Sequence, residues 1–241
     1  MPKASATALA ALIVCGPLAF NAQGALPLPT SWEVAGQFRA TANTPSTLWQ
    51  YGWRSTPLSA NFNHLTFALP SPQWPNGFKG YQQAANYGAL PVIYQNQKTV
   101  PNFLNSNQIA ARAVILHPGD QIDEVAVLRF KAPRAAHYRV SGQFYAGDAG
   151  GAGTRTGVSL VATLPSQLTP TTLWSGNINY QTQPQASFTS TQVMLNAGSV
   201  LDFVVSGAPP NDWANGSTGL NAVIEIIGCY RGPFDPPCDP E

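Results

Sequence analysis

Apolar and polar residues alternate in short runs along most of this chain, and each run stops at a turn. Two segments, residues 125–144 and 193–206, share one layout: an alternating run, a small-residue turn containing Pro or Gly, and a second alternating run. Alternation with a period of two places successive side chains on opposite faces of a strand. Each segment therefore predicts two half-buried antiparallel strands, and together they indicate a β-sandwich.

The same pattern continues on both sides of these segments, and we expect some ten strands and no amphipathic helix after the N-terminal region. Residues 70–101 are the least regular part, expected as a long excursion with one short strand at 92–94 and a tight turn at Asn76-Gly77. The regular turn spacing predicts an all-β fold, a jelly-roll-type antiparallel β-sandwich. The other expected strands cover residues 32–39, 48–53, 62–69, 113–116, 124–130, 137–144, 156–163, 172–178, 187–195, 199–206 and 219–227.

The N-terminus has the layout of a secretory signal. Lys3 precedes an uncharged apolar run over residues 8–20, and small residues stand before Ala25. We expect a cleaved signal peptide at 1–24 and a secreted, extracellular or cell-surface protein without a membrane span in the mature chain. A buried N-terminal helix, or a lipoprotein anchored through Cys15, are the alternatives.

Two cysteines remain after cleavage, and both lie near the C-terminus. An even pair in an exported protein predicts a disulfide, here between Cys229 and Cys238, with a thiol metal site as the alternative. We expect a β-sandwich domain over residues 25–228 and a Pro-rich, disulfide-closed tail over 229–241.

The amino-acid composition argues against one class of binding partner, nucleic acid. Charged residues make up 10% of the 241 residues, and the formal net charge is +1. The cations are scattered along the chain rather than clustered in a basic stripe, so nucleic acid is not an expected partner.

The chain resembles a family of uncharacterised secreted bacterial β-sandwich domains, which often occur in proteins with a C-terminal PEP-type sorting signal. The resemblance implies the sandwich fold and export, and it implies no activity. The chain departs from the family at Gly216, where Asp is usual. It also departs at the C-terminus, where Cys238-Asp239-Pro240-Glu241 replaces an apolar anchor. The matching elements are Phe38, Trp49-Gln50-Tyr51-Gly52-Trp53, Leu116-His117-Pro118, Val127-Leu128-Arg129-Phe130-Lys131-Ala132-Pro133, Tyr138-Arg139-Val140-Ser141-Gly142-Gln143-Phe144, Leu195-Asn196-Ala197-Gly198-Ser199-Val200-Leu201-Asp202-Phe203 and Ser217-Thr218-Gly219-Leu220.

Two aromatic groups are candidates for ligand binding. Trp49, Tyr51 and Trp53 would project from one face of a strand and could stack on sugar rings. The alternative is that this stripe belongs to the core, which Gly52 favours because a glycine there indicates close backbone packing.

The second group lies in a loop around Trp213, where Asn211, Asp212 and Asn215 would hydrogen-bond sugar hydroxyls while the indole stacks. The alternative is that Trp213 folds back and covers one end of the sandwich.

Metal and catalytic signals are weak. His64, His117 and His137 have no ligand spacing, and no Asp ladder for Ca²⁺ exists, so no cofactor is expected beyond a structural Ca²⁺ near Asp120, Asp123 and Glu124. The chain has no G-x-S-x-G elbow, and Asp202 has the pattern of an outward-facing strand residue, so we expect no enzyme.

The function expected from the sequence is therefore a secreted, non-catalytic binding module for carbohydrate or another surface polymer. A structural or matrix protein that self-associates through edge strands is the alternative, and a hydrolytic enzyme is a distant third.

Overall fold

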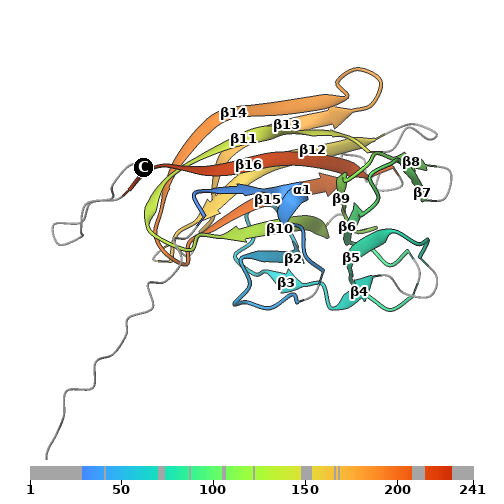
Figure 1. The fold of residues 1–241 in the computed structure, drawn as a ribbon, viewed down its shortest axis with the longest axis horizontal. Coiled ribbons are helices and arrows are strands. Elements are labelled where there is room, and N and C mark those ends of the chain that lie inside the picture. The colour runs from blue at the N-terminus through green and yellow to red at the C-terminus, as the bar shows by residue number, and fades with distance from the viewer. Residues whose placement is uncertain are drawn as a thin grey trace, which may run out of the picture.

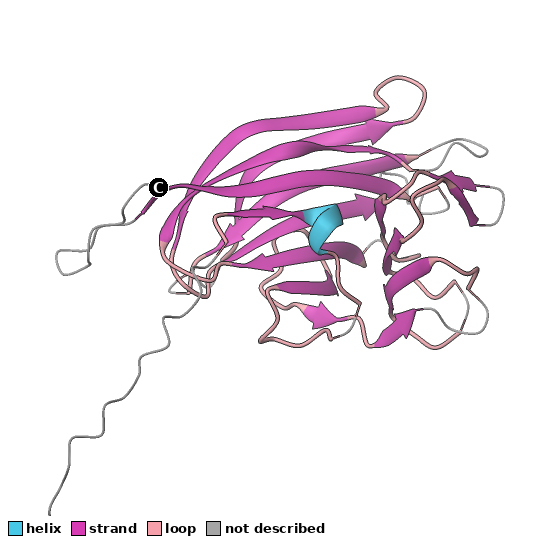
Figure 2. Cartoon of the chain, viewed as in Figure 1, coloured by secondary structure: helices cyan, strands magenta, loops and turns pink. Residues whose placement is uncertain are grey.

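Two antiparallel β-sheets lie face to face and make up most of the fold, and one short helix lies beside them in the described part of the chain (Figures 1 and 2). The computed structural model describes residues 29–40, 42–69, 74–86, 88–104, 107–121, 123–147, 154–165, 167, 169–207 and 215–229. In this part of the chain, no helix is long and apolar enough to cross a bilayer. The expected all-β, jelly-roll-type sandwich is confirmed.

The strands divide between the sheets as follows. The larger sheet has the order β14 (Gln185–Leu195), β11 (Ala136–Ala146), β16 (Thr218–Cys229), β9 (Val114–His117), β6 (Val92–Asn96), β5 (Phe78–Gln82) and β4 (Phe67–Leu69), and β1 (Ser31–Glu33) pairs with β16. The smaller sheet has the order β13 (Thr171–Asn179), β12 (Arg155–Thr163), β15 (Val200–Gly207), β10 (Val125–Lys131), β2 (Trp49–Arg54) and β3 (Asn63–His64). A hairpin of β7 (Asn102–Leu104) and β8 (Asn107–Ile109) and the helix α1 (Val34–Gln37) complete the fold.

The core lies between the two sheets and follows the alternation in the sequence. Leu201, Phe203 and Val205 of β15 face Tyr138 and Phe144 of β11, and all five are fully buried. Removal of one such side chain from water stabilises the fold by about 1.5–3 kcal/mol. The alternating runs therefore supply the inner faces of both sheets.

Both signature segments form two strands each, as expected, but the two strands of a segment lie in different sheets. Residues 125–144 and 193–206 do not form hairpins, because β10 and β15 belong to the smaller sheet while β11 and β14 belong to the larger one. The Pro- and Gly-containing turns are corners at which the chain passes from one sheet to the other. Alternation identifies the strands, but each strand hydrogen-bonds to partners that are distant in the sequence.

The two corners contact each other directly. The Ala132 N–H donates to the Ser199 carbonyl at 2.8 Å, and the Gly198 N–H donates to the Ala132 carbonyl at 2.9 Å. Gly198 has a φ of +83°, a left-handed conformation that glycine adopts without strain. Ala132 is 2% and Ser199 0% exposed, so the hydrogen bond between these two residues is shielded from water.

Three other segments differ from expectation. Residues 32–39 were expected as one strand, but β1 ends at Glu33 and α1 redirects the chain so that the Phe38 ring packs on Tyr51, with centroids 4.9 Å apart. Residues 62–69 divide into β3 and β4, which belong to different sheets. The excursion over 70–101 contains β5 as well as β6, because β5 pairs with both β4 and β6.

The outer face of the smaller sheet carries a buried ion-pair cluster. Asp202 lies between the core residues of β15 and points to this outer face, as its pattern predicts, yet it is 0% exposed. Its carboxylate lies 2.5 Å from the Arg54 guanidinium and 2.8 Å from that of Arg129. Arg129 also lies over the Phe62 ring, 3.8 Å from its centroid. The segment after β2 thus covers the sheet.

His64 lies under this cover as well. Its ring meets Phe62 edge-on at 4.9 Å, and its Nε2 atom is buried without a hydrogen-bond partner among the described residues. Burial, and then the charge of nearby Arg129, lower the pKa of His64 below its ordinary value. The folded protein therefore favours the neutral imidazole.

Asp202→Asn is expected to destabilise the fold by about 3–5 kcal/mol, because two guanidinium groups lose their buried counter-charge. Urea unfolding measures the loss. Asp123→Asn, an exposed carboxylate on the same chain, is the matched control and should change stability by less than about 0.5 kcal/mol. Equal small effects of the two variants would contradict the buried ion pair.

The pKa shift of His64 predicts a loss of stability in mild acid. The unfolded chain takes up a proton near pH 6.5 while the folded chain resists it, so the free energy of unfolding should fall as pH drops below about 6.5. His64→Gln should flatten this decline between about pH 6.5 and 5, whereas His137→Gln, on an exposed residue, should keep it. Identical pH profiles for the wild type and His64→Gln would show that His64 does not cause the loss of stability in acid.

Candidate functional site

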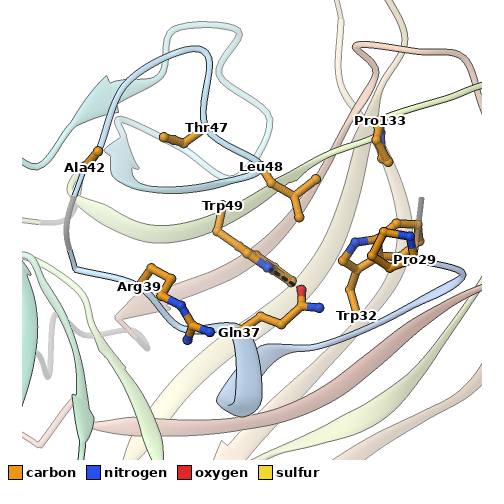
Figure 3. Close-up of a pocket in the computed structure, with 9 residues that line it drawn as sticks. All are labelled: Pro29, Trp32, Gln37, Arg39, Ala42, Thr47, Leu48, Trp49 and Pro133. Carbon is orange, nitrogen blue, oxygen red and sulfur yellow. Dashed lines mark hydrogen bonds between the residues drawn. The ribbon is translucent and has the colours of Figure 1, made fainter. Parts of the chain in front are cut away.

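A pocket opens beside the start of β2, where the N-terminal segment runs along the sandwich (Figure 3). Its volume is about 480 Å³, which is within the range of small-molecule sites. The lining residues come from the N-terminal segment, the approach to β2 and the corner after β10: Pro29, Trp32, Gln37, Arg39, Ala42, Thr47, Leu48, Trp49 and Pro133.

Two tryptophans form the inner wall, one from each sheet. Trp32 is the inward residue of β1 and Trp49 is the first residue of β2. Each ring packs on Phe130 with centroids 5.2 Å apart, so a single core aromatic supports both. Trp32 is 2% and Trp49 7% exposed, which leaves parts of rigidly held rings at the pocket.

The polar groups lie on one side of these rings. The Trp49 Nε1–H donates to Gln37 Oε1 at 3.2 Å, the dashed contact in Figure 3. Arg39 donates from Nη1 to the carbonyls of Gly36 and Phe38, at 3.2 and 3.0 Å. None of the described lining residues is a carboxylate. The pocket therefore combines apolar ring surface with hydrogen-bond donors that suit hydroxyl or anionic oxygens.

The aromatic stripe of β2 divides between pocket and core. Trp49 borders the pocket, but Tyr51 is 0% exposed and stacks on Tyr81, with centroids 5.2 Å apart. Trp53 is half-buried against the core. The three rings therefore do not form one exposed platform, and at Tyr51 the core interpretation holds. Gly52 is closely packed as expected, since a Cβ there would lie 2.5 Å from the Asn63 carbonyl oxygen.

Tyr51 also positions Arg39. The phenolic oxygen accepts a hydrogen bond from the Arg39 backbone N–H at 3.0 Å. Burial raises the pKa of the Tyr51 phenol, and the hydrogen bond from Arg39 opposes that shift. The phenol therefore stays protonated and holds the end of the N-terminal segment against β2.

The other expected site lies outside the described residues, with one exception. Asn211, Asp212 and Trp213 are not described, and Asn215 is half-buried just before β16. Cys238 and the side chain of Cys229 are likewise outside the described part, so the disulfide remains a prediction. The same holds for the signal peptide at 1–24 and for the tail.

Sequence reasoning missed Trp32, Gln37 and Arg39 as site residues. The alternation of residues 32–39 includes Trp32, but only the pairing of Trp32 with Ile224 of β16 brings it opposite Trp49. Gln37 belongs to α1, a helix within the segment for which the sequence predicted a strand. An isolated Trp in the first strand was the available signal, and its partner could not be inferred from local spacing.

Metal ligands do not gather in the described part of the chain. No group of three or more His, Cys, Asp or Glu side chains there is arranged to hold an ion. Asp120 and Asp123 are exposed, and Glu124 accepts a hydrogen bond from Gln83 at 3.3 Å.

Comparison with known proteins finds only distant structural matches. No family model matches the chain, and no curated protein matches it in sequence. Solved structures with a similar arrangement include the enzymatically active domain of bacteriophage CBA120 tailspike protein 4, at 10% identity and a TM-score of 0.32 over 77% of this chain and 20% of that one. The CBM22-1–GH10 modules of Clostridium thermocellum xylanase 10B, complexed with xylohexaose, match at 10% identity and a TM-score of 0.34 over 65% of this chain and 27% of that one.

A CBM4 structure matches at 12% identity and a TM-score of 0.26, over 68% of this chain and 93% of that one. The chain thus spans about a fifth of the tailspike chain and about a quarter of the xylanase chain.

Tyr51→Phe should lower the free energy of unfolding by about 1 kcal/mol, because the Arg39 N–H loses its acceptor. Chemical denaturation measures the change. The matched control is Tyr180→Phe, since Tyr180 is 43% exposed and the substitution should have little effect. The hydrogen bond would have no structural role if both variants matched the wild type.

Proposed function

We propose that this protein is a secreted, non-catalytic module that binds carbohydrate or another surface polymer in the pocket beside β2. One observation carries the proposal: aromatic rings and polar groups line the same open pocket. The rings are those of Trp32 and Trp49, and the polar groups are the Gln37 amide and the Arg39 guanidinium. A sugar ring has an apolar C–H face and a rim of hydroxyl groups, and this pocket offers a partner for each.

The apolar contact with a sugar would be made by several side chains that line the pocket, rather than by one flat aromatic ring. The tryptophan rings are largely covered, so Pro29, Leu48 and Pro133 supply the rest of the apolar wall. These side chains lose little rotamer freedom on binding, because two are prolines and the rings are fixed by Phe130. A preformed pocket keeps the entropic cost of binding low.

The disposition of Asp202 supports a non-catalytic role. This carboxylate, which the sequence suggested as a candidate acid, is bound by Arg54 and Arg129 on the outer face of the smaller sheet. A general acid must reach the bond that it protonates, and Asp202 is 0% exposed. The pocket beside β2 has donors and apolar surface, which suit binding.

Self-association is a second candidate, favoured by β14. This strand lies at the edge of the larger sheet for eleven residues, so one side of its backbone has no strand partner among the described residues. The register with β11 breaks near Phe188, and Ser190 has a φ of +53°, so the edge is irregular. Because irregular edges resist pairing, the same strand also limits self-association, which keeps it the second candidate. Sedimentation over a hundredfold concentration range separates the two candidates.

Gln37→Ala should weaken binding of a retained polysaccharide about five- to tenfold, since one hydrogen-bonding group of the pocket is lost. Affinity electrophoresis on a panel of polysaccharides identifies the polymer, and calorimetry with its oligosaccharides measures the affinity. Trp49→Phe, which keeps an aromatic ring in the wall but removes Nε1, should also weaken binding.

Gln192→Ala, an exposed glutamine on β14, is the control and should bind as the wild type does. Absence of retardation by every polymer, or unchanged affinity in Gln37→Ala and Trp49→Phe, would refute binding at this pocket.

A further inference from the structure

We propose that the ligand is an anionic polysaccharide whose acidic group binds in a second pocket, on the other side of Arg39. This inference rests on the proposed function, because it assigns the polymer class bound at the pocket beside β2. The second pocket has a volume of about 320 Å³ and lies between the N-terminal segment and β6. Its lining residues are Glu33, Ala35, Gly36, Phe38, Arg39, Gln95, Gln97 and Arg112.

Arg39 joins the two pockets. It lines both of them, and its backbone N–H is fixed by the Tyr51 phenol at 3.0 Å. The two pockets therefore flank the same short segment, residues 33–39. A chain of linked sugars could place one ring against Trp49 and a neighbouring substituent beside Arg39.

The second pocket has an excess of positive charge. Arg39 and Arg112 line it, and Glu33 is its one lining carboxylate. The ion pairs between described residues involve Arg54, Arg129 and Arg139 and leave both pocket arginines without a carboxylate partner. Guanidinium groups bind carboxylate and sulfate oxygens by paired, charge-assisted hydrogen bonds. An anionic ligand would supply the missing partner.

The walls of this pocket are held in place by one buried amide. Gln95 is 1% exposed, and its Nε2 donates to the Ala35 carbonyl at 2.7 Å and to the Arg112 carbonyl at 3.0 Å. Its Oε1 accepts from Gln97 Nε2. Gln95 thus links α1 to the turn before β9. These hydrogen bonds hold the helix and the Arg112 backbone on either side of the pocket.

Arg112 is held in an unusual conformation. Its φ is +59°, a left-handed conformation that is strained for a residue other than glycine. The Arg112 N–H donates to the Lys98 carbonyl at 3.2 Å, and the hydrogen bond from Gln95 fixes its carbonyl. Held in this way, the arginine is presented at the pocket from a rigid turn rather than from a flexible loop.

The ligand class follows from these contacts. Two guanidinium groups match an oxyanion carried on a sugar, either the carboxylate of a uronic acid or a sulfate ester. The first pocket would bind the ring and the second the charged group. Affinity for an acidic chain should then exceed affinity for a neutral chain of equal length, and the difference should shrink as salt screens the charges.

The test is calorimetry with three oligosaccharides of matched length: neutral, uronate-containing and sulfated. At about 20 mM salt we expect at least one acidic oligomer to bind about tenfold more tightly than the neutral one, and at about 0.5 M salt we expect near equality. The comparison of the uronate and sulfate arms identifies the source of the oxyanion.

Arg112→Asn should abolish the preference and leave neutral affinity unchanged, because Asn tolerates a positive φ and removes the charge. Arg155→Gln, which removes one exposed charge at the start of β12, should keep the preference. Melting curves of both variants confirm that the fold is retained.

The outcomes are separable. An equal or weaker affinity for both acidic oligomers, or a preference that survives in Arg112→Asn, would overturn this inference and leave the proposed function standing. If none of the three oligomers and none of the polymers binds, the proposed function and this inference are overturned together.

Discussion

The rest of the sandwich depends on the hydrogen bonds between its two corners. Ala132 is bonded through its N–H to Ser199 and through its carbonyl to Gly198, at the point where the chain passes twice between the sheets. Buried backbone groups must be paired, so the second corner cannot move away without leaving the buried backbone of Ala132 unsatisfied. This constraint places β10 beside β15 and β11 beside β14, and the core fills the space between them.

The pocket beside β2 is a consequence of the same constraint. Pro133 follows directly on Ala132 and forms part of the pocket wall, while Phe130, just before the corner, supports Trp32 and Trp49. The wall is therefore built on the bonded corner and on a buried core ring. The polar side is contributed by α1 and Arg39, which Tyr51 and Gln95 tie to the sheets.

Charged side chains in this structure fall into a buried group and an exposed group. Asp202 is surrounded by Arg54 and Arg129 on the outer face, under residues that cover the sheet, and this cluster serves the fold. Arg39 and Arg112, by contrast, lie at open pockets without a carboxylate partner among the described residues. Paired buried charge stabilises a single arrangement, whereas unpaired exposed charge is available to a ligand.

The sequence alone determined the class of the fold and the positions of most strands, because a period of two depends only on neighbouring residues. It also predicted the close packing of Gly52. It could not decide that residues 125–144 cross between sheets, since partner strands are chosen by hydrogen bonds and packing over long sequence separations. The tertiary structure alone brought Trp32 opposite Trp49, because β1 pairs with β16. It also brought Arg39 into the same pocket as Arg112, because Gln95 of β6 bonds both α1 and the turn before β9.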